Sequence, residues 1–167
     1  GFTASPAVIS SIYKFMEDHG REAEVILCKD RVLALTEKRT KCYLAAFDIG
    51  TTSVVGYLLD SVDGKQLAVT SRLNPQSQFG ADVIARSDHV LQNGSGDELA
   101  RCIRQALDEM LGELAAKAGI ARTEIYQIAV VGNTCMHHLF LNISPASLVH
   151  APYNPAVREN IMAKASD

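Results

Sequence analysis

The longest regular pattern in the sequence is a stripe of apolar residues at helical spacing between Asp97 and Ala118. A helix with one apolar stripe has to bury that stripe against another layer of secondary structure. No polar residue interrupts the stripe, which favours core packing over a cofactor site. Its members are Leu99, Ile103, Ala106, Leu107, Met110, Leu111, Leu114 and Ala118. The pattern therefore predicts a long helix that packs in the core and ends at Gly119.

Short apolar runs before and after this helix predict the strands of a sheet. Three consecutive runs, over 43–48, 53–59 and 65–73, are joined by tight turns, which predicts an antiparallel meander. Residues 74–80 are expected to form a loop. The remaining expected elements are a helix over 81–91, a strand over 125–131 and a short helix that ends at Leu141. Together they predict an α/β fold, in which a mixed sheet contains the three-strand meander and has flanking helices.

The first 42 residues predict a small α/β piece ahead of this sheet. It combines a helix, which Ser5 and Pro6 start and Gly20 ends, with a hairpin. The hairpin is expected over 23–36, with its turn at Lys29-Asp30. The sequence therefore predicts three parts: a linker region over 1–42, the main sheet with its helices over 43–150, and a tail over 151–167. The linker region ends in a polar stretch over 37–41.

Charge and hydropathy argue against two classes of partner. Sixteen basic against nineteen acidic residues give a net charge of −3, and no basic run is present. Nucleic acid is therefore a poor candidate partner. No apolar run approaches the ~20 residues that a membrane helix needs, and the sequence shows no signal-peptide pattern. These observations predict a soluble, cytoplasmic protein that binds neither nucleic acid nor membrane.

The cysteines and histidines show no metal-binding pattern. The four cysteines are Cys28, Cys42, Cys102 and Cys135, and none lies in a CxxC spacing. Four free thiols in a reducing compartment are therefore expected, with no cluster on this chain. His137 and His138 are adjacent on an expected helix and point about 100° apart, so we expect one to be packed and the other exposed.

The string Ala46-Phe47-Asp48-Ile49-Gly50-Thr51-Thr52-Ser53 carries the chemistry that the sequence predicts most clearly. An expected strand delivers Asp48 to its end, and Gly50 lets the backbone turn close to a ligand. Thr51 and Thr52 add hydroxyl and N–H groups, which can form an anion-binding concavity. A carboxylate in this place is suited to hold Mg²⁺ through water. The alternative is a plain β-turn in which Asp48 caps its own backbone.

This string resembles the first phosphate loop of the superfamily that contains actin, sugar kinases, heat-shock chaperone ATPases and acetate kinase. Three further strings are similar to one subgroup, the ferredoxin-linked reductive activators of corrinoid proteins. They are Leu73-Asn74-Pro75-Gln76, Phe79-Gly80-Ala81-Asp82-Val83-Ile84-Ala85-Arg86 and Val130-Val131-Gly132-Asn133-Thr134-Cys135-Met136-His137-His138-Leu139. The resemblance covers about residues 21–155.

The resemblance implies a fold, cofactors and partners. It implies a ribonuclease H-like ATPase lobe over 43–150, in a protein that uses ATP and Mg²⁺ to drive an electron from a [2Fe–2S] domain onto a Co(II) corrinoid protein. The family's cluster cysteines and second ATPase lobe do not occur in this sequence, so we expect a fragment consisting of the linker and the first lobe. A single lobe is expected to bind no cofactor by itself. Its partners would be the corrinoid protein, the second lobe and, through the uncovered surface, a second copy in a homodimer.

The resemblance also assigns roles to residues. Asp48 would organise Mg²⁺ through water, and Gly50, Thr51 and Thr52 would hold the β and γ phosphates. The opposite wall of the cleft would be formed by Gly132, Asn133 and Thr134, where Asn133 also suits a helix N-cap.

A second acid, Asp82, would lie near the cleft and position water or metal, which makes it the second catalytic candidate. The alternative is a surface ion pair between Asp82 and Arg86, four residues apart on one helix. Gln76 is a further candidate for the cleft. Two other functions stay open: a small-molecule kinase lobe of the same superfamily, and a non-catalytic protein-interaction module.

Overall fold

The computed structural model describes residues 1–37 and 40–163. By their internal contacts the residues form two compact units, Gly1–Tyr43 and Leu44–Asp167. Each unit is described by itself below. Two of the expected segments lie partly outside the described residues: the linker over 37–41 includes residues 38–39, and the tail over 151–167 includes residues 164–167.

The first unit is a helix beside a three-stranded sheet. Its elements are β1 (Thr3–Ala4), α1 (Pro6–His19), β2 (Glu24–Cys28) and β3 (Arg31–Thr36). β2 and β3 form the expected antiparallel hairpin, and β1 lies parallel to β3 on its other side. A strand of two residues carries no periodicity, so β1 could not be expected from the sequence.

The ends of α1 form as the sequence predicts. The Ser5 hydroxyl accepts a hydrogen bond from the N–H group of Val8 at 3.3 Å, and Pro6 opens the helix. Gly20 ends it with φ +83°, a positive value that suits glycine, and its N–H group donates to the Met16 carbonyl at 3.0 Å. No residue of α1 is fully buried.

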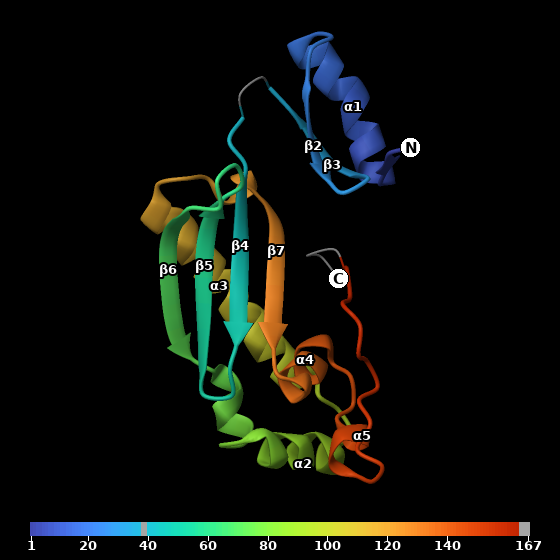
Figure 1. The fold of residues 1–167 in the computed structure, drawn as a ribbon, viewed down its shortest axis with the longest axis vertical. Coiled ribbons are helices and arrows are strands. Elements are labelled where there is room, and N and C mark those ends of the chain that lie inside the picture. The colour runs from blue at the N-terminus through green and yellow to red at the C-terminus, as the bar shows by residue number, and fades with distance from the viewer. Residues whose placement is uncertain (38–39, 164–167) are drawn as a thin grey trace. The chain divides into compact units, whose positions relative to one another are not determined.

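The main sheet has four strands in the order β6-β5-β4-β7 (Figure 1). These are β4 (Tyr43–Ile49), β5 (Ser53–Asp60), β6 (Gln66–Leu73) and β7 (Ile125–Gly132). β5 and β6 pair antiparallel, and Figure 1 shows β7 running in the same direction as its neighbour β4. The predicted mixed sheet with an antiparallel meander is confirmed.

Six helical segments complete the described part of the second unit. They are η1 (Pro75–Phe79, a 3-10 helix), α2 (Val83–Asn93), α3 (Asp97–Ala118), η2 (Arg122–Glu124, also 3-10), α4 (Thr134–Leu141) and α5 (Ala146–Val149). The loop expected over 74–80 is thus largely a 3-10 helix. α2 begins and ends two residues later than expected, because Asp82 caps its start and Gly94, with φ +70°, ends it.

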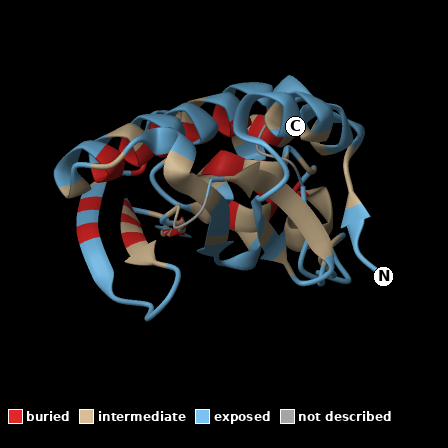
Figure 2. Ribbon diagram, turned by 90° about the horizontal axis from the view of Figure 1, so that it is seen from above, coloured by how far each residue is buried: buried red, intermediate tan, exposed pale blue. Residues whose placement is uncertain are grey.

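α3 covers one face of the sheet, where it contacts β5 and β6. Leu99, Ile103, Met110 and Leu114 are completely buried on the helix, as predicted, although Ala118 at its end is half-buried. On the strands, Val54 and Leu58 of β5 are at 0% exposure and Phe47 of β4 is at 1%. Figure 2 shows the buried positions gathered between the long helix and the strands.

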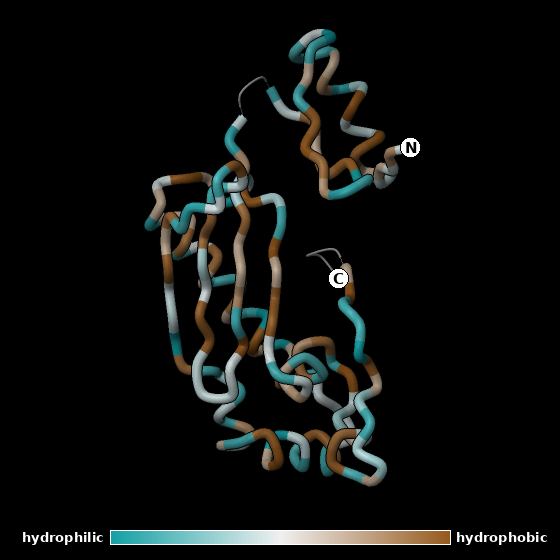
Figure 3. Tube along the Cα trace, in the orientation of Figure 1, coloured by the Kyte–Doolittle hydropathy of each residue, from teal (hydrophilic) through white to brown (hydrophobic). Residues whose placement is uncertain are grey.

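Hydropathy follows the same arrangement along the chain. Figure 3 shows hydrophobic and hydrophilic residues alternating along α2, which is typical of a helix with one buried face. Within the part of the chain that the structure describes, no helix is both long and apolar enough to cross a membrane.

Candidate functional site

The predicted phosphate loop is the turn between β4 and β5, at the edge of the sheet where β4 and β7 end (Figure 1). The N–H group of Gly50 donates to the carbonyl of Ser53 at 2.9 Å, which closes the turn. A Cβ atom at position 50 would lie 2.7 Å from that carbonyl oxygen, so a side chain would force the turn open. Asp48, near the end of β4, has an exposed side chain.

Buried donors hold the carbonyl groups of three consecutive loop residues. The side-chain amide of Asn74 donates to the carbonyl of Gly50 at 2.7 Å, and its backbone N–H group donates to the carbonyl of Thr52 at 2.8 Å. Between them, the guanidinium of Arg86 donates to the carbonyl of Thr51 at 2.7 Å. Both donor residues are at 0% exposure.

This arrangement sets the direction of the loop amides. In a trans peptide the C=O and N–H groups point in opposite directions, so carbonyls held on the buried side leave the following N–H groups on the other side. Among the described residues, the N–H groups of Thr51 and Thr52 have no hydrogen-bond partner. Two free N–H groups, a Thr52 hydroxyl and the Asp48 carboxylate are a donor and acceptor set that fits a phosphate with Mg²⁺.

The second predicted segment lies against this loop. The side-chain amide of Asn133 donates to the hydroxyl of Thr51 at 3.3 Å. The side-chain oxygen of Asn133 accepts from the N–H group of Met136 at 3.0 Å, so Asn133 is also the N-cap of α4. The N-cap interpretation of Asn133 is therefore confirmed, while its place in a nucleotide-binding cleft stays a prediction. The positive end of the α4 dipole lies beside the loop.

Gly132 and Thr134, the two neighbours of Asn133, belong to the same segment. A Cβ atom at Gly132 would lie 2.9 Å from the carbonyl oxygen of Ile49, so the close approach of β7 to the end of β4 requires glycine there. Thr134 is the first residue of α4, and its side chain is exposed. The structure thus brings the segments 50–52 and 132–134 together.

Asp82 does not form an ion pair with Arg86, which their spacing of four residues had suggested as the alternative. Its carboxylate instead caps α2, where one oxygen accepts from the N–H group of Ala85 at 2.8 Å. Arg86 is turned inward and completely buried, whereas Asp82 is exposed. The alternative of a surface pair is therefore wrong, and the catalytic role of Asp82 stays a prediction.

Gln76 was expected as a candidate for the cleft, and this expectation is wrong. The side chain is at 0% exposure and donates to the carbonyl of Leu99 at 3.1 Å. Its backbone N–H group donates to the side-chain oxygen of Asn74 at 2.9 Å, which fixes the Asn74 amide for its bond to the loop. Gln76 supports the loop from behind because the 3-10 helix turns it into the core.

The roles of Asn74 and Arg86 were not predicted from the sequence. One signal for Arg86 was available: it lies three residues after Val83 and four before Val90, on the same side of α2 as these apolar residues. An arginine on the buried side of a helix requires partners inside the protein. Asn74 lies in one of the strings that carry the resemblance, but its position after a strand, in a segment with loop composition, did not indicate what its side chain binds.

The thiols and imidazoles form no ligand set in residues 1–37 and 40–163. Burial raises the pKa of the Cys135 thiol, whose sulfur lies 3.5 Å from the Ser87 hydroxyl. His138 is fully buried and bonded, as one of the adjacent pair was expected to be, while His137 is half-buried rather than exposed.

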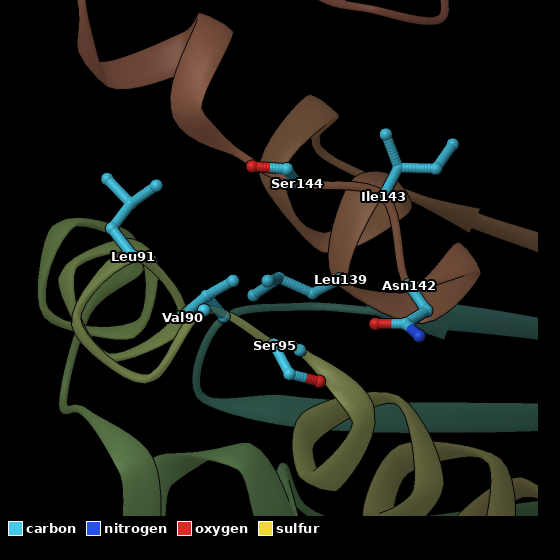
Figure 4. A pocket seen from close by; sticks show the side chains of 9 residues that line it. Val90, Leu91, Ser95, Leu139, Asn142, Ile143 and Ser144 are labelled. Carbon is cyan, nitrogen blue, oxygen red and sulfur yellow. The ribbon is translucent and has the colours of Figure 1, made fainter.

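A pocket of about 250 Å³ lies elsewhere, between the end of α2, the turn before α3 and the end of α4 (Figure 4). None of the site residues predicted from the sequence lines it. It is lined by Val90, Leu91, Gly94, Ser95, Gly96, Leu139, Asn142, Ile143 and Ser144.

Comparisons with known proteins agree with the resemblance seen in the sequence. The chain is 40% identical to the corrinoid activation enzyme RamQ of Eubacterium limosum over 165 residues, which are 95% of this chain and 27% of RamQ. A solved structure described as a reductive activator for corrinoid,iron-sulfur protein superposes with a TM-score of 0.82 at 29% identity, covering 93% of this chain and 26% of that one. The chain thus spans about a quarter of the length of either relative.

The family model described as the RACo middle region matches residues 43–167, which include the whole four-stranded sheet and the candidate site. With most of its length matched by this model, and with RamQ at 40% identity, the chain belongs to the RACo middle region family.

Proposed function

We propose that this chain forms one wall of an ATP-binding cleft in a protein that activates a corrinoid protein by reduction. The corrinoid part of the proposal rests on the two relatives, one described as a corrinoid activation enzyme and the other as a reductive activator. The ATP part rests on the loop between β4 and β5. In the longer protein, a second lobe would close the cleft from the opposite side.

The observation that carries the ATP proposal is the orientation of the loop. Three consecutive carbonyls are held on the buried side, while the N–H groups of Thr51 and Thr52 stay free among the described residues. Gly50, Thr51 and Thr52 would bind the β and γ phosphates. The Gly132-Asn133-Thr134 segment would meet the same phosphates from the start of α4, where helix N–H groups favour anions.

Asp48 would hold Mg²⁺ through coordinated water. Its carboxylate is exposed and has no hydrogen-bond or ion-pair partner in the described ranges, so it is free to accept from such water. Mg²⁺, when bound, neutralises phosphate charge and polarises the bond that hydrolysis breaks. Asp82 would position a water molecule or the metal with the oxygen that does not cap α2.

The electron donor in this proposal is a [2Fe–2S] cluster on another domain of the longer protein. The cysteines described here do not fit a cluster, because no group of three potential ligands comes together within the described residues. The work of this chain is nucleotide binding, which would change the angle between the two lobes and so bias contact between the donor and the corrinoid protein.

ATP turnover by the full-length protein tests the proposal. We expect Asp48→Asn to lower kcat/KM for MgATP hydrolysis by at least about tenfold, because the variant cannot hold the water shell of Mg²⁺ with a charge. Asp63→Asn is the matched control, since Asp63 lies in a turn and accepts from the N–H group of Lys65, which asparagine can also do. ATP-dependent formation of Co(I) from Co(II), followed by absorbance, should fall with Asp48→Asn. Hydrolysis that is unchanged by Asp48→Asn would contradict the role of Asp48.

A further inference from the structure

Arg86 is a buried cation directly behind the candidate phosphate loop. Its guanidinium donates to the carbonyl of Gly80 at 2.9 Å through Nε and to the carbonyl of Thr51 at 2.7 Å through Nη2. The third contact, from Nη1, is to the sulfur of Met136 at 3.4 Å. The side chain is at 0% exposure, so it reaches no solvent.

Its charge has no counter-ion in the part of the chain that the structure describes. No carboxylate oxygen lies within 4.0 Å of the guanidinium, and Asp82 acts on it from a longer distance. Arg72 and Arg122, by contrast, are paired with carboxylates at the surface. Burial lowers the pKa of Arg86 from its usual value. A buried charge without a partner is costly, and a ligand of opposite charge bound nearby would reduce that cost.

The bond to Thr51 connects this charge to the loop. The carbonyl of Thr51 and the N–H group of Thr52 belong to one peptide group, so a cation on the oxygen polarises the bond and makes the N–H group a stronger donor. Asn74 binds the preceding carbonyl, of Gly50, without a charge. Of the two peptide groups, Gly50–Thr51 and Thr51–Thr52, only the second therefore accepts a hydrogen bond from a charged group.

We propose that Arg86 is a positioning residue, which orients and polarises the Thr51–Thr52 peptide for an anionic ligand and whose counter-ion is that ligand, the polyphosphate of a magnesium nucleotide. This inference rests on the proposed ATP site. It adds that the charge of Arg86, on α2, raises the affinity of the loop for anions although the ligand does not contact this side chain.

A structural brace would explain the same hydrogen bonds, and two substitutions separate the interpretations. Arg86→Gln keeps an N–H donor for the Thr51 carbonyl but removes the charge. Arg86→Lys keeps the charge and one donor. A brace predicts that both variants bind alike, whereas a fixed charge predicts that lysine restores binding that glutamine loses.

The experiment measures the dissociation constants of MgATP and of magnesium pyrophosphate with the full-length protein by calorimetry. We expect Arg86→Gln to bind both ligands about 10- to 100-fold more weakly than wild type, the usual effect of losing one charge-assisted interaction. Arg86→Lys should stay within about fivefold of wild type. Arg122→Gln, which removes a surface charge from the pair with Asp108, is the control for net charge and should bind as wild type does.

The outcomes distinguish the two proposals. If wild type binds neither ligand, the proposed ATP site fails. If wild type binds and Arg86→Gln binds as tightly as Arg86→Lys, the ATP site stands and the role of Arg86 is overturned. Should Arg86→Gln not fold, the NMR signal of the Arg86 Nη2–H group in wild type, which donates to the Thr51 carbonyl, decides. It is expected to shift as magnesium pyrophosphate saturates the protein, and an unmoved signal at saturation would overturn the inference.

Discussion

Side chains that reach no solvent set the direction of the amides in the loop between β4 and β5. Asn74 and Arg86 are both completely buried, and between them they bind the carbonyls of Gly50, Thr51 and Thr52. Buried polar groups are tolerated when their hydrogen bonds are made, and here the bonds that satisfy them also fix the loop. The exposed residues of the loop would contact a ligand, but the buried ones decide its geometry.

Substitutions of Asp82 can separate helix capping from catalysis, because the two roles require different properties of its side chain. Asp82→Ala should lower the free energy of unfolding by about 1 kcal/mol through loss of the cap, whereas Asp82→Asn should keep it, since asparagine is an equally good N-cap. Urea unfolding of both variants measures this. If Asp82 also positions water or metal, ATP turnover should fall in both variants. If turnover falls only in Asp82→Ala, the variant that loses stability, Asp82 has a capping role alone.

The sequence indicated the loop residues of the candidate site but not the buried residues that hold the loop. Asp48, Gly50, Thr51 and Thr52 could be chosen because an acid, a glycine and two hydroxyls after a strand form a chemical pattern. The inward turn of Arg86 depends on which face of α2 meets the core, which a spacing of four residues from Asp82 does not determine. A pairwise charge pattern therefore predicted a surface pair where the fold buries the cation.

At the scale of elements, strong periodicity and clear ends made α3 predictable to the residue. The expected bounds, Asp97 and Ala118, are those of the structure, and Gly119 ends the helix with φ +66°. The 3-10 helix η1 was not expected because a side-chain cap from Asn74 holds it, and five residues show no hydrophobic period. Short elements of this kind depend on tertiary contacts.

The stability of the main unit should depend on the buried stripe of α3. Met110 is completely buried, so Met110→Ala should lower the free energy of unfolding by about 2–5 kcal/mol through lost contacts and the cavity that remains. Arg101→Ala, on the exposed side of the same helix, should change it by less than about 0.5 kcal/mol. Chemical denaturation checks both values, and equal effects would contradict the packing described here.

His138 joins α4 to the tail. Its Nε2 accepts from the N–H group of Ala156 at 3.1 Å, so Nδ1 carries the proton that it shares with the carbonyl of Thr134 at 2.8 Å. We expect His138→Phe to speed hydrogen exchange at the Ala156 amide, because the acceptor is lost. His137→Phe is the control and should leave that exchange unchanged. Equal protection of Ala156 in wild type and His138→Phe would show that the tail is held by other contacts.

At the scale of the whole molecule, carboxylates at the surface of the second unit share one response to pH. A hydrogen bond from the Thr70 hydroxyl and the charge of Arg72 lower the pKa of Glu113, and Arg72 lowers that of Glu109. Arg122 likewise lowers the pKa of Asp108. Each group binds a proton more weakly in the folded protein than in the unfolded chain.

The sign of the pH dependence follows from these shifts. Stability from a carboxylate with a lowered pKa is complete above its ordinary pKa and is lost as the pH falls through the folded value. The free energy of unfolding should therefore decrease as the pH falls below about 4.5. Urea titrations at several pH values measure the slope, and Arg72→Met should flatten it. A free energy of unfolding that stays constant over this range would contradict the ion pairs.

In the proposed complex with nucleotide, the amides of Thr51 and Thr52 face a phosphate group. A crystal structure of the full-length protein with Mg²⁺ and a non-hydrolysable ATP analogue tests it most directly. We expect β- or γ-phosphate oxygens within hydrogen-bonding distance of both N–H groups, with water-coordinated Mg²⁺ beside Asp48. A nucleotide bound with its phosphates away from this loop, for example in the pocket beside Ser95 and Asn142, would contradict the claim.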